Sequence, residues 1–438
     1  MNGERKFFGH PGGLATLFFT EMWERFSYYG MRAFLILYMV HALGFDDRHA
    51  GRVYGNYTAG VWAAAIVGGI IADWWLGQYR SVLIGGIIIA VGHFTLAFHP
   101  LPFFYTGLSL IVVGTGLLKP NVSGIVGALY EPDDARRDAG FSIFYMGINL
   151  GAFIGPLIAG WLAQKVDWHL GFACAGVGMS LGLLQYVLGR RSLQPAIERL
   201  ARRPKPVVTA MAAPAPSGGF WGFTATEWKR IGAMGVFFVL AAIFWGAYEQ
   251  AGSSLNLFGD RYTTLRILGF SFPSSWYVSI QAIFVILLAP AFAWLWIRLG
   301  KYEPTTPTKF AFGLFFVGLS FLFLLIPASA IQGTPGLRVS PFWLVGCYFI
   351  QELGELCISP VGLSVFTKLA PVKIVGMMLG VWFLADSVGN KVAGYAAGFI
   401  SSAPLTQLFG VVGAVCVGAS LVAFAIVKPV KRLMGGVR

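Results

Sequence analysis

Long apolar runs alternate with short polar breaks along almost the whole chain. A helix needs about 20 consecutive apolar residues to cross the hydrocarbon core of a bilayer. Runs of about that length predict approximately twelve membrane-spanning helices, near residues 13–40, 51–75, 81–99, 102–129, 140–163, 169–189, 231–258, 273–297, 308–328, 340–366, 374–400 and 405–427. The pattern therefore predicts an all-α, multi-pass membrane protein.

One polar break, residues 190–230, is much longer than the others. It has an Arg-rich stretch followed by an Ala- and Pro-rich one, and its Pro and Gly residues disfavour a helix, so it predicts a cytoplasmic linker. The linker divides the chain into a six-helix bundle at residues 1–189 and another at residues 231–438. Two pseudo-symmetric halves are typical of transporters that bind their substrate between the halves, near the middle of the membrane.

Composition and charge agree with membrane insertion. Hydrophobic residues make up 56% of the chain and charged residues only 12%, too few to cover a soluble core of this size. The net charge of +13 comes from Lys and Arg in alternate connections, such as Arg136, Arg190 and Lys428, which fits the positive-inside rule rather than nucleic-acid binding. Both termini are expected in the cytoplasm, and no removed signal peptide is predicted.

The first predicted helix carries charges that an apolar segment normally excludes. Glu21, Glu24, Arg25, Tyr28 and Arg32 follow the spacing i, i+3, i+4, i+7 and i+11, which places them on one helical face. Each ionisable group costs about 2.5 to 3.5 kcal/mol at the bilayer centre, so such groups usually face a wet cavity and mark a substrate or proton path. This face predicts a transporter, and an enzyme is disfavoured because the sequence has no phosphate-binding glycine loop, metal-ligand cluster or nucleophile triad.

Other spans carry polar groups as well: Lys119-Pro120 in the fourth, Asn149 in the fifth, Glu249 in the seventh, and Glu355 with Ser359-Pro360 in the tenth. The four cysteines show no metal-ligand spacing, so we expect neither a metal nor a cofactor apart from protons as the coupling ion. Pro120 and Pro360 can kink their helices for gating, and rigid packing is equally compatible with them.

Sequence motifs carry a family resemblance. The loop with Asp73 and Arg80 resembles the signature of the major facilitator superfamily, in which the two can form a charge network. The run Glu-x-x-Glu-Arg-Phe-x-Tyr-Tyr-Gly at residues 21–30, Lys-Pro-Asn at 119–121 and Phe-Tyr-x-x-Ile-Asn-x-Gly at 144–151 resemble the proton-dependent oligopeptide transporters. Trp-x-x-x-Glu-Gln at 245–250 and Gly-Glu-Leu-x-x-Ser-Pro at 354–360 extend the match over both halves.

The resemblance implies a proton-coupled symporter that imports di- and tripeptides, acts as a monomer in the plasma membrane (the inner membrane of a bacterium) and has the major facilitator fold. It implies that Arg32 receives the peptide carboxylate, that Glu355 receives the ammonium group, and that Glu21, Glu24, Arg25 and Glu249 couple the proton. The substrate-binding residues implied in this way are Arg25, Tyr28, Tyr29, Arg32, Trp62, Lys119, Asn149, Gln281, Glu355, Ser359 and Trp382.

Several positions depart from the family pattern. Trp62 stands where a tyrosine is usual, Gln281 replaces an Asn-Pro pair, and Glu352 and Asp386 are additional acids of open role. These changes keep two alternatives open: a carrier of the same superfamily for another zwitterionic or anionic solute, and a peptide-sensing receptor derived from a transporter. Purely structural ion pairs, including one between Lys119 and Glu355, are a further alternative for the buried charges.

Overall fold

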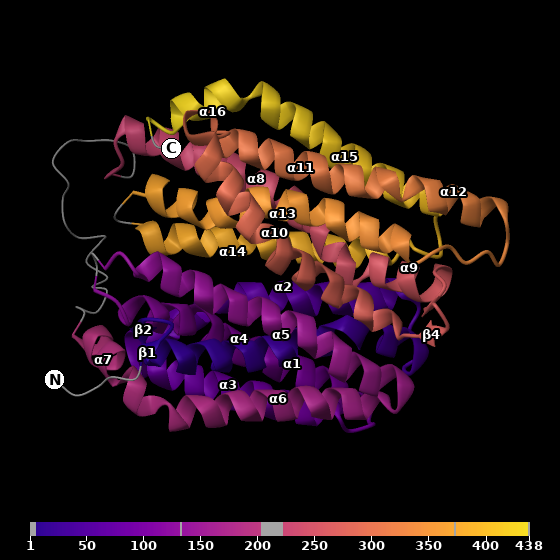
Figure 1. Ribbon diagram of the computed structural model, residues 1–438, viewed down its shortest axis with the longest axis horizontal. Coiled ribbons are helices and arrows are strands. Elements are labelled where there is room, and N and C mark those ends of the chain that lie inside the picture. Colours follow the sequence, from indigo (N-terminus) through magenta and orange to yellow (C-terminus); the bar gives the residue numbers. More distant parts are fainter. Residues whose placement is uncertain (1–5, 132–133, 203–221, 372–373, 437–438) are drawn as a thin grey trace. The chain divides into compact units, whose positions relative to one another are not determined.

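The chain is shown as a computed structural model that describes residues 6–131, 134–202, 222–371 and 374–436 (Figure 1). It forms two compact units. The first contains Met1–Gly44, Gly60–Pro206 and Ile267–Ile283, and the second contains Phe45–Ala59, Val207–Arg266 and Phe284–Arg438. The predicted division into residues 1–189, 190–230 and 231–438 stays a prediction, and residues 203–221 of that linker lie outside the described residues.

The first half of the chain begins with a hairpin of two short strands and continues as helices. Its elements are β1 (Lys6–Phe7), β2 (His10–Pro11), α1 (Gly13–His41), α2 (Asp47–Ile71), the π-helical turn η1 (Ala72–Leu76), α3 (Gln78–Leu96), α4 (Leu101–Ala128), α5 (Arg137–Lys165), α6 (Trp168–Leu188) and α7 (Arg190–Ala201). The β1–β2 turn uses positive φ angles at Phe8 and Gly9, as tight hairpins require.

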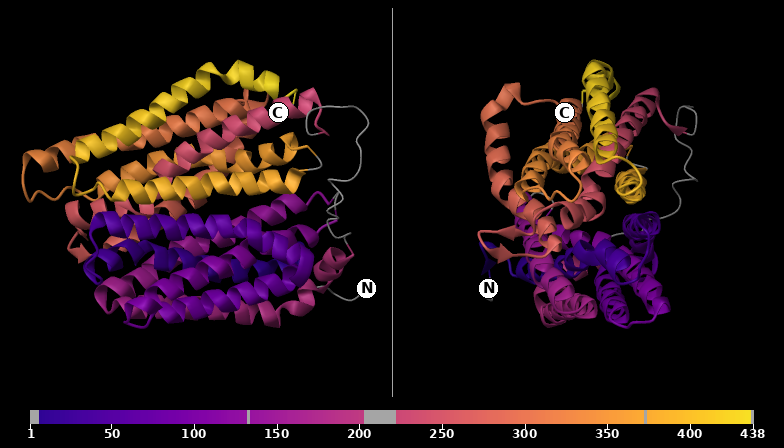
Figure 2. Two further views of the ribbon diagram at one scale, coloured as in Figure 1. Left: turned by 180° about the vertical axis from the view of Figure 1, so that it is seen from behind. Right: turned by 90° about the vertical axis from the view of Figure 1, so that its right-hand side faces the viewer.

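The second half is also helical, with one hairpin near its start. Its elements are α8 (Ala225–Tyr248), η4 (Glu249–Gly252), α9 (Ser254–Tyr262), β3 (Arg266–Ile267), β4 (Phe270–Ser271), η5 (Ser274–Trp276), α10 (Tyr277–Leu299), η6 (Gly300–Tyr302), α11 (Thr306–Phe323), α12 (Leu325–Gly333), α13 (Phe342–Leu369), α14 (Val375–Ala397), α15 (Leu405–Ala425) and α16 (Val427–Leu433). In each unit the long helices run side by side, as the two views of Figure 2 show.

The predicted membrane spans agree with these helices. Within the described residues, ten helical segments are long and apolar enough to cross a membrane. Two more, α1 with 29 residues and α14 with 23 residues, are long enough but carry the buried charges discussed below. The chain is therefore a multi-pass membrane protein, and twelve spans are consistent with its helices.

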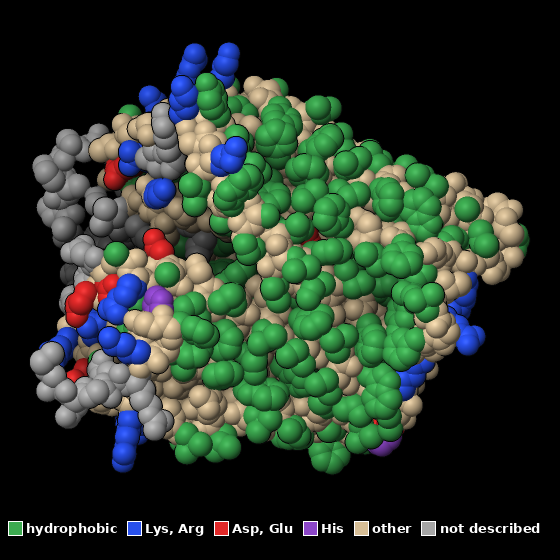
Figure 3. All heavy atoms as spheres, in the orientation of Figure 1, with side chains coloured by type: hydrophobic (Ala, Val, Ile, Leu, Met, Phe, Trp, Pro, Cys, Tyr) green, Lys and Arg blue, Asp and Glu red, His purple; other side chains and the backbone are tan. Residues whose placement is uncertain are grey.

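The surface also fits a lipid environment. In Figure 3 hydrophobic side chains cover the lengths of the helices, while Lys and Arg side chains lie near the helix ends. Large apolar residues such as Ile297 and Leu188 are 82% and 72% exposed. Soluble monomers rarely expose continuous apolar areas of this kind, and lipid tails would cover them here.

Helices α3 and α4 of the first unit approach each other through paired glycines. A Cβ atom on Gly114 would lie 2.6 Å from the Gly85 carbonyl oxygen, and one on Gly107 would lie 2.8 Å from that of Gly92. Neither distance can be reached by a real side chain without a backbone shift. Small residues at these four positions therefore let the two backbones touch, as in other membrane helix pairs.

Each unit also includes part of a helix from the other half of the sequence. In the first unit the start of α10 packs on α5, where Ser279 donates a hydrogen bond to the Phe153 carbonyl at 2.8 Å. In the second unit the start of α2 packs on α14, where a Cβ on Gly51 would lie 2.3 Å from the Gly394 carbonyl oxygen. The Arg261 guanidinium of α9 also donates two hydrogen bonds, of 2.8 and 2.6 Å, to Asp47 at the start of α2.

The expectation of a linker without helix is wrong for residues 190–201, which form α7. The helix forms despite Pro195 because Leu193 and Ala196, three residues apart, are both fully buried in the apolar core of the first unit. Arg199, on the next turn, donates hydrogen bonds to the Ala128 carbonyl and to Glu131 after α4. Tertiary packing thus overrides the local preference of the sequence.

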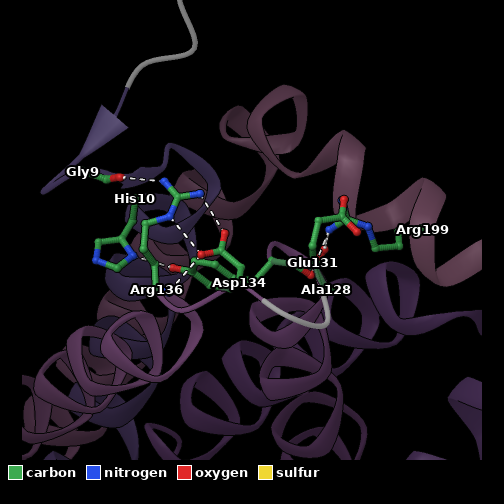
Figure 4. A network of polar contacts seen from close by, with 8 residues as sticks. Gly9, His10, Ala128, Glu131, Asp134, Arg136 and Arg199 are labelled. Carbon is green, nitrogen blue, oxygen red and sulfur yellow. Dashed lines mark hydrogen bonds and ion pairs between the residues drawn. The ribbon is translucent and has the colours of Figure 1, made fainter.

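A neighbouring network holds the N-terminal hairpin to the same end of the first unit (Figure 4). Arg136 donates a hydrogen bond to the Gly9 carbonyl at 3.1 Å and two to the Asp134 carboxylate at 3.0 and 2.8 Å. His10 is hydrogen-bonded to Tyr130 at 3.0 Å. The hydrogen bonds from Arg136 lower the pKa of Asp134 to about 2, so this carboxylate stays ionised down to strongly acidic pH.

The glycine contacts between α3 and α4 predict the effect of one added methyl group. We expect Gly114→Ala to lower the unfolding temperature of the purified protein, since overpacking costs about 1 to 3 kcal/mol. Gly124→Ala is the matched control on the same helix, because a Cβ atom there meets nothing within 4 Å. A thermal melt that ranks the two variants equally would refute close packing at Gly114.

Candidate functional site

Arg25 occupies the centre of the buried charges on α1. Its guanidinium hydrogen-bonds both carboxylate oxygens of Glu24, one of them at 2.6 Å, and lies 3.4 Å from a Glu21 oxygen. All three side chains are at most 2% exposed. The other Glu21 oxygen has no hydrogen-bond partner among the described residues. Arg25 thus contacts two buried acids, and its contact with Glu21 is longer than its contact with Glu24.

Two tyrosines on the same helix separate Arg25 from the second arginine. The Arg25 guanidinium lies 5.0 Å from the ring centre of Tyr28 and 5.9 Å from that of Tyr29. The Arg32 guanidinium lies 6.0 and 5.8 Å from the same two rings. All four distances between a guanidinium and a ring centre allow cation–π attraction. The stripe predicted from the spacing is therefore present, and Arg32 is 6% exposed.

Trp62 and Lys119 form a contact that the sequence did not predict. The Lys119 ammonium lies 4.2 Å from the ring centre of Trp62, within the first unit. Tryptophan is the strongest of the aromatic partners for a cation. Where the family usually has a tyrosine, this chain therefore has a larger ring facing a lysine of α4.

The two amides predicted for substrate binding are also buried in the first unit. Asn149 is 7% exposed and donates a hydrogen bond to the Tyr145 carbonyl one turn earlier at 3.0 Å. Gln281 is 9% exposed and lies on the part of α10 that packs on α5. The structure thus brings the predicted residues of α1, α2, α4, α5 and the start of α10 into one unit.

In the second unit Glu249 lies where a membrane helix is interrupted. The predicted span 231–258 is α8, then the short 3₁₀ helix η4, then α9, and Glu249 is the first residue of η4. It is 7% exposed. Interrupted helices in transporters place backbone and side-chain groups at binding sites. The break was not predicted, although Gly252 and the two following serines gave a local signal for it.

The acids of α13 are held by hydroxyl groups. Ser359 donates a hydrogen bond to Glu355 at 2.8 Å, and Tyr248 of α8 donates one to Glu352 at 2.8 Å. Trp382 of α14 is 5% exposed and packs against the rings of Phe310 and Phe366. The sequence analysis assigned no role to Tyr248. Its place next to Glu249 in the chain was the signal that could have pointed to it.

The remaining predicted positions lie outside this buried set. Asp73 and Arg80 are both exposed at the connection of α2 to α3, and Gln78 donates a hydrogen bond to Asp73 at 2.8 Å. Pro120 and Pro360 lie inside α4 and α13. Their gating role stays a prediction. Lys119 belongs to the first unit and Glu355 to the second, so the pairing of these two residues also stays a prediction.

Comparison with known proteins decides the family. The model of the POT family, the proton-dependent oligopeptide transporters, matches residues 79–199 and 222–415. This chain belongs to the POT family. It is thus a transporter of the major facilitator type, not an enzyme, and the resemblance read from its motifs is confirmed.

Individual relatives of this POT family member match it over nearly its whole length. The chain is 37% identical to a di-/tripeptide transporter of Lactococcus lactis subsp. cremoris, over 99% of both chains. It is 37% identical to the peptide transporter YePEPT of Yersinia enterocolitica, over 99% of this chain and 97% of the relative. A crystal structure of a peptide transporter POT in complex with sulfate matches with a TM-score of 0.90 and 40% identity, covering 99% of this chain and 98% of that one.

The contact between Trp62 and Lys119 predicts an energetic coupling. We expect a double-mutant cycle of Trp62→Leu and Lys119→Met to give a coupling free energy of about 0.5 to 2 kcal/mol, because the cycle isolates the cation–π interaction. The free energies of unfolding of the variants are measured in detergent. Trp161→Leu on α5, where the indole is 44% exposed, should be additive with Lys119→Met. Additivity in both cycles would show that Lys119 gains nothing from Trp62.

Proposed function

We propose that this protein is a proton-coupled symporter that imports di- and tripeptides by alternating access. The observation that carries the proposal is the α1 stripe, in which Arg25 contacts two acids and Arg32 lies near the rings of Tyr28 and Tyr29. A carrier for a zwitterion with a free carboxylate needs such a cation. A proton-driven carrier needs acids whose charge depends on a movable partner.

The substrate roles follow from charge. Arg32 binds the peptide carboxylate, with Arg25 and Lys119 adding positive potential. Glu355 of α13, oriented by Ser359, binds the ammonium group. Tyr28, Tyr29, Asn149 and Gln281 hydrogen-bond the peptide backbone, and Trp62 and Trp382 contribute aromatic walls. Because these groups read the ends and the backbone of a peptide rather than its side chains, the carrier accepts many sequences.

Proton coupling uses two sets of acids. Glu21 and Glu24 take up a proton when Arg25 releases one of them, and Glu249 does so at the interrupted helix of the second unit. A membrane potential of 100 mV adds about 2.3 kcal/mol for each proton that moves inward. We propose that the protein works as a monomer in the plasma membrane, with both termini in the cytoplasm and no metal or organic cofactor.

A second candidate function is transport of another small zwitterion. A POT family transporter that is 30% identical to this chain, with a TM-score of 0.87, has been crystallised in complex with 5-aminolevulinic acid. Coverage is 98% of both chains. Trp62 and Gln281 differ from the usual family residues at their positions, and this difference favours keeping the second candidate.

The test is uptake of labelled dialanine into proteoliposomes, with and without an inward proton gradient and a negative internal potential. Accumulation that collapses with a protonophore is expected. 5-Aminolevulinic acid in the same assay separates the two candidates. Absence of uptake, together with no competition by peptides, would overturn peptide transport.

A single substitution then tests the coupling scheme. We expect Glu24→Gln to abolish proton-driven accumulation but to retain peptide counterflow, because the amide still hydrogen-bonds but cannot exchange a proton. Glu131→Gln is the control, since Glu131 is an exposed acid that is paired with Arg199 outside the spans. Unchanged accumulation in Glu24→Gln would remove this residue from the scheme.

A further inference from the structure

Two buried acids lie three residues apart on α13 in the second unit. Glu352 is fully buried and Glu355 is 7% exposed, and their spacing of three residues places them on one face of the helix. Side chains at this spacing are neighbours on the surface of a helix, so the two carboxyl groups can approach each other. Each also accepts a hydrogen bond from a hydroxyl at 2.8 Å, Glu352 from Tyr248 and Glu355 from Ser359.

Each of the two acids keeps one oxygen without a hydrogen-bond donor among the described residues. Within the described part of the chain, the second oxygen of Glu352 and that of Glu355 have no hydrogen-bond partner. An ionised carboxylate can only accept hydrogen bonds, so two ionised groups cannot bond each other. They would also repel each other at a site with little water. One added proton removes both penalties, because the protonated acid donates to its ionised neighbour.

The groups around the pair do not replace that proton. The helices packed on α13 contribute Tyr248 from α8, Lys309 from α11 and Asp386 from α14, and Glu249 of η4 lies close enough to act on Glu355. Tyr248 donates its hydroxyl to Glu352, and Glu249 adds negative charge near Glu355. Lys309 is bonded to Glu303 and lies 4.6 Å from the ring centre of Trp296. The surroundings therefore favour a neutral acid beside a single carboxylate.

We propose that Glu352 and Glu355 bind one proton between them, with Glu352 as the acid that donates to the Glu355 carboxylate. This gives α13 a proton site separate from the acids of α1 and from Glu249. The proton comes from water and is released to water, and no other bond changes. The shared proton leaves Glu355 with one negative charge. This charge matches the single ammonium group of a peptide, a point that rests on the proposed function.

Infrared difference spectroscopy of the lipid-embedded full chain tests this directly. The spectrum of the wild type minus Glu352→Gln at pH 7 should show the C=O band of one protonated carboxylic acid, and D₂O should shift that band. Glu303→Gln is the matched control, because Glu303 is 42% exposed and ion-paired with Lys309 and should contribute no such band. A wild-type spectrum without a band assignable to Glu352 would overturn the proposal.

A second variant locates the proton and does not depend on the folding of Glu352→Gln. Tyr248→Phe removes the hydroxyl that donates to Glu352, so the band should persist at higher frequency. A band that Tyr248→Phe leaves unmoved would place the proton on another group and overturn the assignment. Both spectra are recorded without peptide. The shared proton can therefore be confirmed even if dialanine uptake fails, and it can fail while peptide uptake stands.

Discussion

An ion inside an apolar helix bundle must have a partner, and in this protein the requirement is concentrated on one turn of α1. Desolvating a carboxylate or a guanidinium costs several kcal/mol, and close pairing with further hydrogen bonds is what offsets it. Arg25 meets the requirement for Glu24 with two hydrogen bonds and for Glu21 with a longer contact. Glu21 keeps one oxygen without a hydrogen-bond partner among the described residues, so its charge is compensated less completely than that of Glu24.

The two units carry opposite excess charge at their predicted sites. The first unit places Arg25, Arg32 and Lys119 near two acids, whereas the second places Glu249, Glu352 and Glu355 on η4 and α13. A peptide has one negative and one positive end, so each unit suits one end. If Glu352 were ionised as well, α13 would present two negative charges to a single ammonium group. The proton that we propose Glu352 and Glu355 share leaves one negative charge.

Much of this arrangement was predictable from the sequence, because helical periodicity alone places Glu21, Arg25 and Arg32 on one face. Apolar run lengths located the spans to within a few residues. Contacts between distant segments were not predictable, since no local pattern records that Tyr248 reaches Glu352 or that Lys119 lies on Trp62. The helix α7 was missed for the same reason, because its formation depends on a core built by α1, α3 and α4.

The paired glycines of α3 and α4 have a mechanical consequence. Where the two backbones are in direct contact, no layer of side chains lies between them that could slide or repack. We therefore expect α3 and α4 to move together at these two contacts. Within the first unit, α3 and α4 therefore act as one mechanical element.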